Sequence, residues 1–422
     1  MAKIKHIWSR EILDSRGIPT VETACMLDTN AISVSSVPAG TSTGSHEALE
    51  LRDTDNPRYM GQGVLKAVEY VNNVLGQAII GMDPTDQITI DRKLVELDGT
   101  DNKSRFGSNA ILSVSEVIAK SGAVSTNQSL YSWIYTLGSS GNITTKVKIP
   151  TPLFNMVNGG LHGAGNLDFQ EFWVVPASNK TFSEALQMGV EIYQTIGKNL
   201  SHRGAIHSVG QEGGFAPNLF TNADALEVFV ESINQTTYAL GRDVFLGLDV
   251  AANSFYKEGE YVIKDRTGGM DDNQFMEFYK GLMDQYKLAI LEDPFQEDAW
   301  DSWKKMNSAM SGSVTVVGDD LLATNPKRVE KAIAEKACNA AVIKPNQIGT
   351  VTETLNVVKM VRDAGWKVVI SHRSGETNDS FIADFAVGVA ADFIKSGAPA
   401  RGERVAKYNR LSAIEVELSR AK

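Results

Sequence analysis

Val244-Phe-Leu-Gly-Leu-Asp249 and Leu288-Ala-Ile-Leu-Glu292 are the first two of six short apolar runs, each of which ends at a charged or metal-binding side chain. The other four runs follow the same rule and end at Asp319, Lys344, His372 and Lys395. From Glu292 onward, the end residues lie 27, 25, 28 and 23 positions apart, about the length of one strand, one helix and two loops. Buried parallel strands read as continuous apolar runs and need crossover helices. The stretch therefore predicts a (β/α)8 barrel, whose active site gathers at the C-terminal strand ends.

The beginning of this barrel is expected to be less regular. Pro152–Asn158 and Asp168–Pro176 are predicted as consecutive strands, and helices are predicted over Phe182–Arg203 and Ala223–Leu240. Two strands and two helices thus precede the strict alternation. A short hairpin, Ser254–Lys264, is predicted as an insertion after the strand that ends at residue 249.

The first third of the chain has a different pattern, with strands followed by helices. Strands are predicted at Ile4–Ile12 and Thr20–Leu27. The helical stretches that follow run from Val64 to Ile80, Pro84 to Leu97, Ser108 to Ser121 and Ser129 to Leu137. Asp83 is the expected N-cap of the second of these helices, because proline is favoured directly after a cap. Strands followed by helices imply a separate domain. We expect an N-terminal α+β domain with a lid loop over residues 1–137, a linker over 138–145 and the barrel over 146–422.

The charge and the cysteine content restrict the class of protein. Lys plus Arg number 41 against 51 Asp plus Glu, a net charge of −10 without a basic run, which argues against a nucleic acid partner. Cys25 and Cys338 lie far apart in the chain and predict reduced thiols in a cytoplasmic protein. The first ten residues lack the apolar core of a signal peptide. The apolar stretch Phe381–Ile394 contains two Asp residues and is too short to span a bilayer, so we do not expect a membrane protein.

The charged strand ends also admit a structural explanation, in which each one caps the next helix or lies in a solvated loop. Three carboxylates followed by Lys, His and Lys argue instead for a shared site. Asp249, Glu292 and Asp319 offer only oxygen ligands, which suits Mg²⁺ better than Zn²⁺. The alternative for these three acids is mutual repulsion relieved by Lys344 or Lys395, because converging anions raise each other's pKa.

Short polar motifs occur in order along nearly the whole chain. They are Leu13-Asp-Ser-Arg-Gly17, Ser42-Thr-Gly44, His46-Glu-Ala-Leu-Glu-Leu-Arg-Asp53, Leu97-Asp-Gly-Thr100, Asn158-Gly-Gly160 with His162, Gln170-Glu-Phe172, Glu212-Gly-Gly214, Glu292-Asp-Pro-Phe295, Asn346-Gln-Ile-Gly349, Ser371-His-Arg-Ser-Gly-Glu-Thr377 and Lys395-Ser-Gly-Ala-Pro-Ala-Arg401. In this order and at this spacing, the motifs resemble those of the enolase (phosphopyruvate hydratase) family. The resemblance implies an enolase-type (β/α)8 barrel starting ββαα, preceded by an N-terminal α+β domain.

The resemblance also implies a reaction and its metal ions. The expected enzyme is a Mg²⁺-dependent carbon–oxygen lyase that interconverts 2-phospho-D-glycerate and phosphoenolpyruvate in glycolysis and gluconeogenesis. Two Mg²⁺ ions are implied, one bound by Asp249, Glu292 and Asp319 and a second bound by Ser42 and the substrate phosphate. Lys344 matches the family's general base, and a neighbouring lysine and a metal ion are expected to lower its pKa.

Further site residues follow from the same resemblance. Glu212 matches the general acid, Glu171 is expected to assist it, and His162 lies on a loop that closes over the substrate. Arg373 and Ser374 match a phosphate clamp, since the guanidinium fork suits phosphate oxygens. The other expected substrate-binding residues are Gln170, Glu292, Asp319, Lys344, His372 and Lys395. Taken alone, Glu212 is also compatible with an ordinary turn carboxylate and Arg373 with a surface salt bridge.

The chain departs from the family pattern at Ala39, Gln211, Ser254 and Pro345. None of these positions is an expected catalytic group, so the departures bear on rate and loop closure. One alternative function is a related acid-sugar dehydratase or racemase, which would be expected to carry a Lys-x-Lys pair where this chain has Gln170-Glu171.

A second alternative is a non-catalytic binding protein displayed at the cell surface or secreted without a signal peptide. Enolase-like proteins are known for such roles, including plasminogen capture, and Lys422 is a C-terminal lysine of the suitable kind. For the enzyme itself, the resemblance implies a cytoplasmic homodimer or octamer with a small-molecule substrate.

Overall fold

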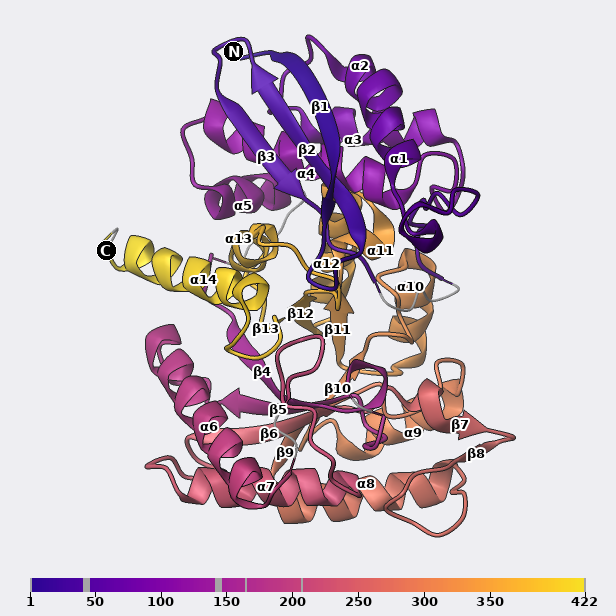
Figure 1. Ribbon diagram of the computed structural model, residues 1–422, viewed down its shortest axis with the longest axis vertical. Coiled ribbons are helices and arrows are strands. Elements are labelled where there is room, and N and C mark those ends of the chain that lie inside the picture. The colour runs from indigo at the N-terminus through magenta and orange to yellow at the C-terminus, as the bar shows by residue number, and fades with distance from the viewer. Residues whose placement is uncertain (1, 41–45, 141–145, 164, 206–207, 421–422) are drawn as a thin grey trace.

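The computed structural model of the chain describes residues 2–40, 46–140, 146–163, 165–205 and 208–420. The predicted metal ligand Ser42 and the C-terminal Lys422 lie outside these described residues. In Figure 1, the indigo and purple N-terminal segment forms one end of the molecule, and the rest of the chain builds the barrel and its helices.

The N-terminal part consists of an antiparallel sheet with helices packed against it. The strands, in the order β1-β2-β3, are β1 (Ile4–Leu13), β2 (Pro19–Leu27) and β3 (Ile32–Ser36). The helices are α1 (Leu65–Tyr70), α2 (Gly76–Ile79), α3 (Gln87–Asp98), α4 (Ser108–Ser125) and α5 (Leu130–Ser140). A π-helical turn, Val71–Leu75, joins α1 to α2. The predicted helix Val64–Ile80 is therefore one helix with a wider turn in its middle.

Helix α3 begins later than the sequence suggests. The side chain of Asp86 accepts a hydrogen bond from Thr89 N and caps the helix. Asp83 instead accepts hydrogen bonds from N and Oγ1 of Thr85. The expected cap at Asp83 is wrong, because Asp83 and Thr85 form a turn that precedes the helix.

Helix α4 connects the two parts of the molecule. Fifteen of its 18 residues are buried, as expected for a helix with neighbours on all sides. It packs against β2 and β3, and also against α11 (Pro345–Ile348) and α12 (Val351–Asp363) of the barrel part. The N-terminal part is thus held directly over the barrel segment that begins after Lys344.

The barrel is closed and made of eight described strands in the order β10-β11-β12-β13-β4-β5-β6-β9. Its strands are β4 (Thr151–Asn158), β5 (Glu171–Pro176), β6 (Val244–Asp249), β9 (Leu288–Glu292), β10 (Thr315–Gly318), β11 (Ala340–Ile343), β12 (Lys367–Ser371) and β13 (Phe393–Lys395). Alternate side chains of these strands, among them Leu153, Trp173 and Val342, form one hydrophobic cluster. Such inward-facing layers fill a barrel of this size.

The start of the barrel confirms the predicted ββαα order, because α6 (Phe182–His202) and α7 (Asn222–Asn234) follow β4 and β5. Helix α7 ends before the predicted Leu240. Thr236 Oγ1 donates a hydrogen bond to Ile233 O and accepts one from Tyr238 N. This local bonding by a hydroxyl group competes with continuation of the helix.

The remaining elements surround the barrel (Figure 1). The helices are α8 (Asp272–Tyr286), α9 (Trp300–Met310), α10 (Pro326–Glu335), α13 (Phe381–Gly388) and α14 (Gly402–Arg420). The predicted hairpin insertion is present as β7 (Tyr256–Lys257) and β8 (Glu260–Tyr261). The fold class, an α+β part followed by a closed barrel, is therefore confirmed. The exact division at residues 137 and 146 stays a prediction, and α5 continues to Ser140.

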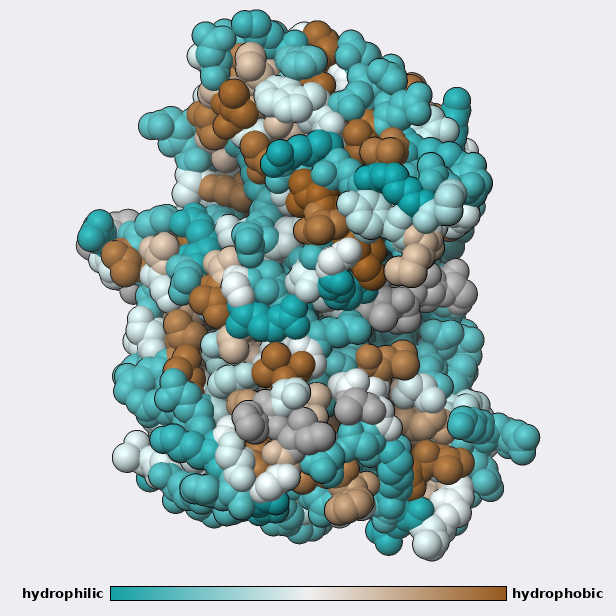
Figure 2. Space-filling view, in the orientation of Figure 1, coloured by the Kyte–Doolittle hydropathy of each residue, from teal (hydrophilic) through white to brown (hydrophobic). Residues whose placement is uncertain are grey.

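Figure 2 shows one face of the molecule, on which brown hydrophobic residues are scattered among teal hydrophilic ones. Within the described residues, none of the helices combines the length and the apolar character needed to cross a bilayer.

Candidate active site

The six strand-end residues predicted from the sequence meet at one rim of the barrel. Asp249, Glu292 and Lys395 are the last residues of β6, β9 and β13, and Asp319, Lys344 and His372 directly follow β10, β11 and β12. A cavity of about 320 Å³ opens at this rim. The predicted residues among its lining are His162, Gln170, Glu171, Glu212, Asp249, Asp319, Lys344, His372, Arg373, Ser374 and Lys395. Glu292 is fully buried and joins this group through Lys395.

Strand direction explains why Glu171 reaches the same rim. Strand β5 runs antiparallel to both of its neighbours, so its first residue pairs with their last residues. Glu171 is opposite Asn158 on one side and Asp249 on the other. In a parallel strand, the last residue would occupy this place instead.

Lys395 is the centre of the carboxylate group. Its Nζ donates hydrogen bonds to Glu292 Oε1 at 2.6 Å and to Asp249 Oδ2 at 3.2 Å, and it lies 3.5 Å from Glu171 Oε1. Burial lowers the pKa of Lys395, but the surrounding carboxylates outweigh burial and raise this pKa well above its usual value. Lys395 is therefore a permanent cation here. The sequence left open a structural alternative, in which a lysine relieves the repulsion among the carboxylates, and this contact of Lys395 is part of that arrangement.

Lys344 forms a second ion pair at the rim. Its Nζ donates a 2.5 Å hydrogen bond to Asp319 Oδ2. Burial lowers the pKa of Lys344, yet the attraction of Asp319 is stronger and leaves this pKa raised. The sequence led us to expect a lowered pKa for Lys344, whereas in the structure this pKa is raised. Lys344 also precedes Pro345 and has extended φ and ψ angles, as expected for a residue before proline.

The carboxylates retain oxygen atoms that a cation could use. Glu292 Oε2 and Asp319 Oδ1 are buried and have no hydrogen-bond partner among the described residues. A buried carboxylate oxygen without a partner is costly, and an all-oxygen set suits a hard cation. The residues present therefore fit Mg²⁺, the ion on which the enolase family generally depends.

The three predicted ligands do not, however, form the tightest acidic cluster. Asp293, Asp319 and Asp320 have ligand atoms within 4.8 Å of one another, whereas Asp249 and Glu292 are not part of such a group in the described chain. Their side chains turn toward Lys395 instead. Asp293 accepts hydrogen bonds from the backbone N–H groups of Asp319 and Asp320, so it supports the backbone at the end of β10.

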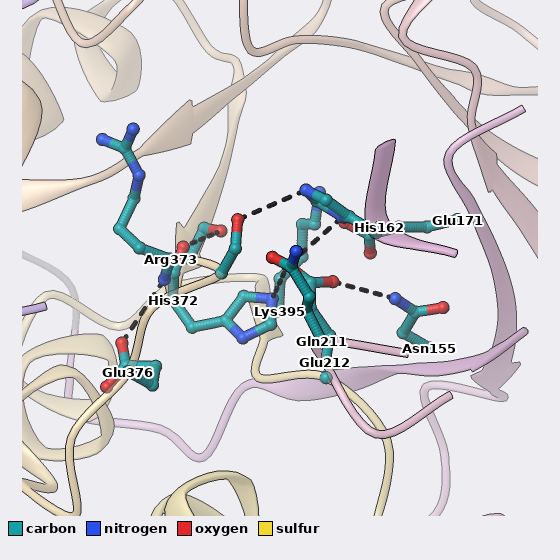
Figure 3. Close-up of polar contacts among 12 residues, drawn as sticks. Asn155, His162, Glu171, Gln211, Glu212, His372, Arg373, Glu376 and Lys395 are labelled. Atoms are coloured by element: carbon teal, nitrogen blue, oxygen red, sulfur yellow. Dashed lines mark hydrogen bonds and ion pairs between the residues drawn. The ribbon is translucent and has the colours of Figure 1, made fainter. Parts of the chain in front are cut away.

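A second group of side chains combines His162 with two acids (Figure 3). His162 Nδ1 lies 3.4 Å from Glu212 Oε1 and 3.7 Å from Glu171 Oε1. Burial raises the pKa of Glu171, and repulsion by Glu212 adds to this, so that the pKa is about 8. Burial also raises the pKa of Glu212, but His162, together with His372 and Arg404, outweighs burial and holds this pKa well below the usual range. The pair therefore separates into an acid that keeps its proton at neutral pH and one that loses it.

Glu212 is held from several sides. Asn155 Nδ2 donates a 2.9 Å hydrogen bond to its Oε2, and His372 Nε2 lies 3.5 Å from its Oε1. Burial lowers the pKa of His372 well below its usual value, so the ring is neutral.

The predicted phosphate residues lie beside this group. Arg373 Nη1 donates hydrogen bonds to Glu47 Oε2 at 2.9 Å and to Asn346 Oδ1 at 3.1 Å. Ser374 Oγ lies 3.3 Å from His162 Nε2. In Figure 3, the Arg373 side chain extends away from His162, Glu171 and Glu212. Arg373 is thus a buried, paired guanidinium rather than a surface salt bridge.

Several contributing residues were missed from the sequence. Trp173 Nε1 donates to Glu171 Oε2, and Asn155, Asn346 and Arg404 each bind a predicted site residue. The sequence pointed only weakly to Trp173 and Asn155, because Trp173 lies on the predicted strand that carries Glu171 and Asn155 lies on the predicted strand before it. Arg404 had none, because only the packing of α14 brings it to the site.

The departures from the family pattern lie around this site. Ser254 lines the cavity, and its Oγ donates to Ala251 O. Ala39 exchanges backbone hydrogen bonds with Gly375, directly after the predicted phosphate residues. Gln211 precedes Glu212 and accepts a hydrogen bond from Arg404 through its backbone oxygen.

Comparison with known families agrees with this arrangement. Residues 4–134 match the family model described as "Enolase, N-terminal domain". Residues 146–422 match the model described as "Enolase, C-terminal TIM barrel domain". Since the two matches follow each other and together span most of the sequence, the chain belongs to the enolase family.

Proposed function

We propose that the protein is a phosphopyruvate hydratase that reversibly dehydrates 2-phospho-D-glycerate to phosphoenolpyruvate and water. The observation that carries this proposal is the presence, in one cavity, of two lysines paired with carboxylates and of a Glu171–His162–Glu212 group. The first group suits removal of a proton next to a carboxylate. The second suits protonation of a departing hydroxide.

In the proposed reaction, Lys344 removes the proton from the carbon that carries both the carboxylate and the phosphate. The electron pair left on this carbon forms the double bond, and the hydroxyl of the neighbouring carbon leaves as water with a proton from Glu212. Lys344 must be neutral to accept a proton, whereas its ion pair with Asp319 favours the charged form. When bound by Asp249, Glu292 and Asp319, Mg²⁺ would compete with Lys344 for Asp319 and stabilise negative charge on the substrate's carboxylate.

The supply of the second proton is proposed to involve both acids. Glu212 loses its proton readily, whereas Glu171, with a pKa of about 8, keeps one at neutral pH. His162 Nδ1 lies near an oxygen of each. We assign Glu171 and His162 the task of returning a proton to Glu212, which remains the proposed general acid.

The other predicted residues are proposed to position the substrate. Arg373 and Ser374 bind its phosphate, since the guanidinium offers several donors in a fixed geometry. Lys395, His372 and Gln170 border the same cavity. A second Mg²⁺ held by Ser42 and the phosphate also belongs to the proposal. We further propose a glycolytic and gluconeogenic role in the cytoplasm, as a homodimer or octamer.

The deciding experiment is a turnover assay in which phosphate resonances report 2-phosphoglycerate and phosphoenolpyruvate. We expect conversion in both directions, its loss on chelation of divalent ions, and its recovery when Mg²⁺ is restored. The Lys344→Ala variant should lose nearly all of its turnover under every one of these conditions. D-glycerate, which lacks the phosphate, should not be dehydrated.

Two results would refute this function. Dehydration of unphosphorylated hydroxy acids in preference to 2-phosphoglycerate would favour the acid-sugar alternative. A folded protein without turnover that binds plasminogen, and no longer does so after removal of Lys422, would favour the surface binding role.

A further inference from the structure

Arg404 is a buried cation outside the predicted set of site residues. It lies on α14, its exposed fraction is 0%, and it is among the largest fully buried side chains of the described chain. A guanidinium cannot be deprotonated in a protein, and burying it is costly unless it has partners. The partners of Arg404 therefore indicate its role.

The backbone partners of Arg404 belong to two loops at the barrel rim. Nη1 donates to Arg373 O at 2.7 Å, and Nη2 donates to Ser374 O at 2.5 Å and to Gln211 O at 3.0 Å. Gln211 immediately precedes Glu212. One side chain thus connects the turn that carries the proposed acid to the loop that carries the proposed phosphate ligands.

The second kind of partner is a histidine ring. Arg404 Nη1 lies 2.7 Å from His372 Nδ1. Because arginine has donors but no acceptor, Nδ1 must be the accepting nitrogen without a proton. The proton of the neutral ring is then on Nε2, and this nitrogen lies 3.5 Å from Glu212 Oε1. Which ring nitrogen carries the proton is commonly set by the bond that the other one makes.

We propose that Arg404 is a positioning residue, which holds His372 in the Nε2–H tautomer so that this N–H faces Glu212 Oε1. Asn155 holds the other carboxylate oxygen, so Glu212 is oriented from both sides. The effect of Arg404 on turnover rests on the function proposed above, whereas the tautomer of His372 does not.

The chain offers a matched control on the same helix. Lys407 lies one turn after Arg404 and is also buried. Its Nζ donates to Glu376 Oε2 at 2.6 Å and to Thr377 O at 2.6 Å. Lys407 thus holds the loop that follows Ser374, and its hydrogen bonds with described residues go neither to His372 nor to Glu212. Its loss should loosen the fold without changing the tautomer.

The test is proton–nitrogen NMR of the full-length protein labelled with ¹⁵N-histidine, without substrate. A His372→Gln sample assigns the resonances of His372. We expect the Nε2–H tautomer in the wild type and in Lys407→Met, and a shift toward the Nδ1–H form or a mixture in Arg404→Met. Arg404→Lys provides the same comparison if Arg404→Met does not fold. Relative to Lys407→Met, kcat of the Arg404 variant should be lower by on the order of 10²-fold.

Each other outcome has a distinct meaning. An Nδ1–H tautomer in the wild type, or an unchanged tautomer in both Arg404 variants, overturns the inference. Equal losses of kcat in the Arg404 and Lys407 variants would reduce Arg404 to a structural residue. A wild type that shows the expected tautomer but no turnover would refute the proposed function and leave the control of His372 by Arg404 standing.

Discussion

Lys344 Nζ and Asp319 Oδ2 are joined by a 2.5 Å hydrogen bond, so the proposed base is paired in the resting protein with a proposed metal ligand. Lys344 cannot act as a base, and Asp319 cannot give this oxygen to a metal ion, while the ion pair between them is intact. A lysine must be neutral to remove a proton, and a carboxylate partner favours its charged form. Whether Lys344 is charged or neutral therefore depends on whether Asp319 remains its partner.

Replacing Lys344 by Met should lower kcat by about 10²–10⁴-fold, the contribution typical of a general base. Asp319 loses its partner in this variant, so binding of Mg²⁺ should be retained or strengthened. Steady-state kinetics and calorimetric titration with Mg²⁺ measure the two effects. The matched control is Lys359→Met, which removes an ion pair on the outer surface of α12 and should change neither. A Lys344 variant within tenfold of wild-type kcat would contradict the assignment.

Replacing Glu292 by Gln should weaken Mg²⁺ binding, because Glu292 Oε2 is a buried carboxylate oxygen to which no described residue donates a hydrogen bond. Binding can be followed without turnover, since a ligand at 100 times its Kd raises the free energy of unfolding by about 2.7 kcal/mol. We expect Mg²⁺ to raise the melting temperature of the wild type, and Glu292→Gln to need much more Mg²⁺ for the same rise.

The control for this experiment is Asp298→Asn. Asp298 belongs to another group with closely spaced ligand atoms, together with His46 and Glu297, but this group already contacts Arg328. If Asp298→Asn reduced Mg²⁺ stabilisation as much as Glu292→Gln, the predicted metal site would be misplaced.

Replacing Arg373 by Lys keeps the charge but removes the planar fork of donors, so it should impair phosphate binding. We expect the KM for 2-phosphoglycerate to rise by about tenfold or more, with a smaller change in kcat. Competitive inhibition by inorganic phosphate gives a second measure, because the inhibition constant of phosphate should rise in the variant in parallel with KM. A fall in kcat at constant KM would instead assign Arg373 a role in the chemical step.

The barrel could be predicted from the sequence because buried parallel strands leave continuous apolar runs. The same runs located Asp249, Glu292 and Lys395 at strand ends, which is where the structure has them. Glu171 could not be located in this way. Its strand runs in the opposite direction, so its first residue rather than its last one reaches the rim.

The sequence could not predict which side chains of the site pair with one another. The pairing of Lys344 with Asp319, and of Lys395 with Glu292 and Asp249, depends on distances across the barrel rather than on spacing along the chain. Arg404 is an extreme case, because it lies on the outer helix α14 and reaches the site only through tertiary packing. Ser42, which the resemblance implies as a metal ligand, lies outside the described residues, so its role stays a prediction.

A last prediction concerns stability and comes from a buried acid between the two parts of the molecule. Ser35 Oγ lies 2.8 Å from Glu116 Oε2 and 3.2 Å from Asp379 Oδ2. One hydroxyl proton cannot serve both carboxylates, so a protonated Glu116 completes the network. Burial, reinforced by the charge of Asp379, raises the pKa of Glu116 to about 8, against about 4.5 without the fold.

This shift has a defined sign. The folded state holds the proton of Glu116 more tightly than the unfolded state, so its stabilising effect is complete below about pH 4.5 and is lost as pH rises to about 8. Glu116→Gln keeps a neutral side chain at every pH. Compared with the wild type, it should therefore gain free energy of unfolding between pH 5 and 8, by at most about 1.4 kcal/mol per pH unit. Denaturant unfolding at several pH values measures this difference, and Glu330→Gln on the exposed face of α10 should show none. A difference between Glu116→Gln and wild type that stays constant from pH 5 to 9 would mean that Glu116 is ionised in the folded protein.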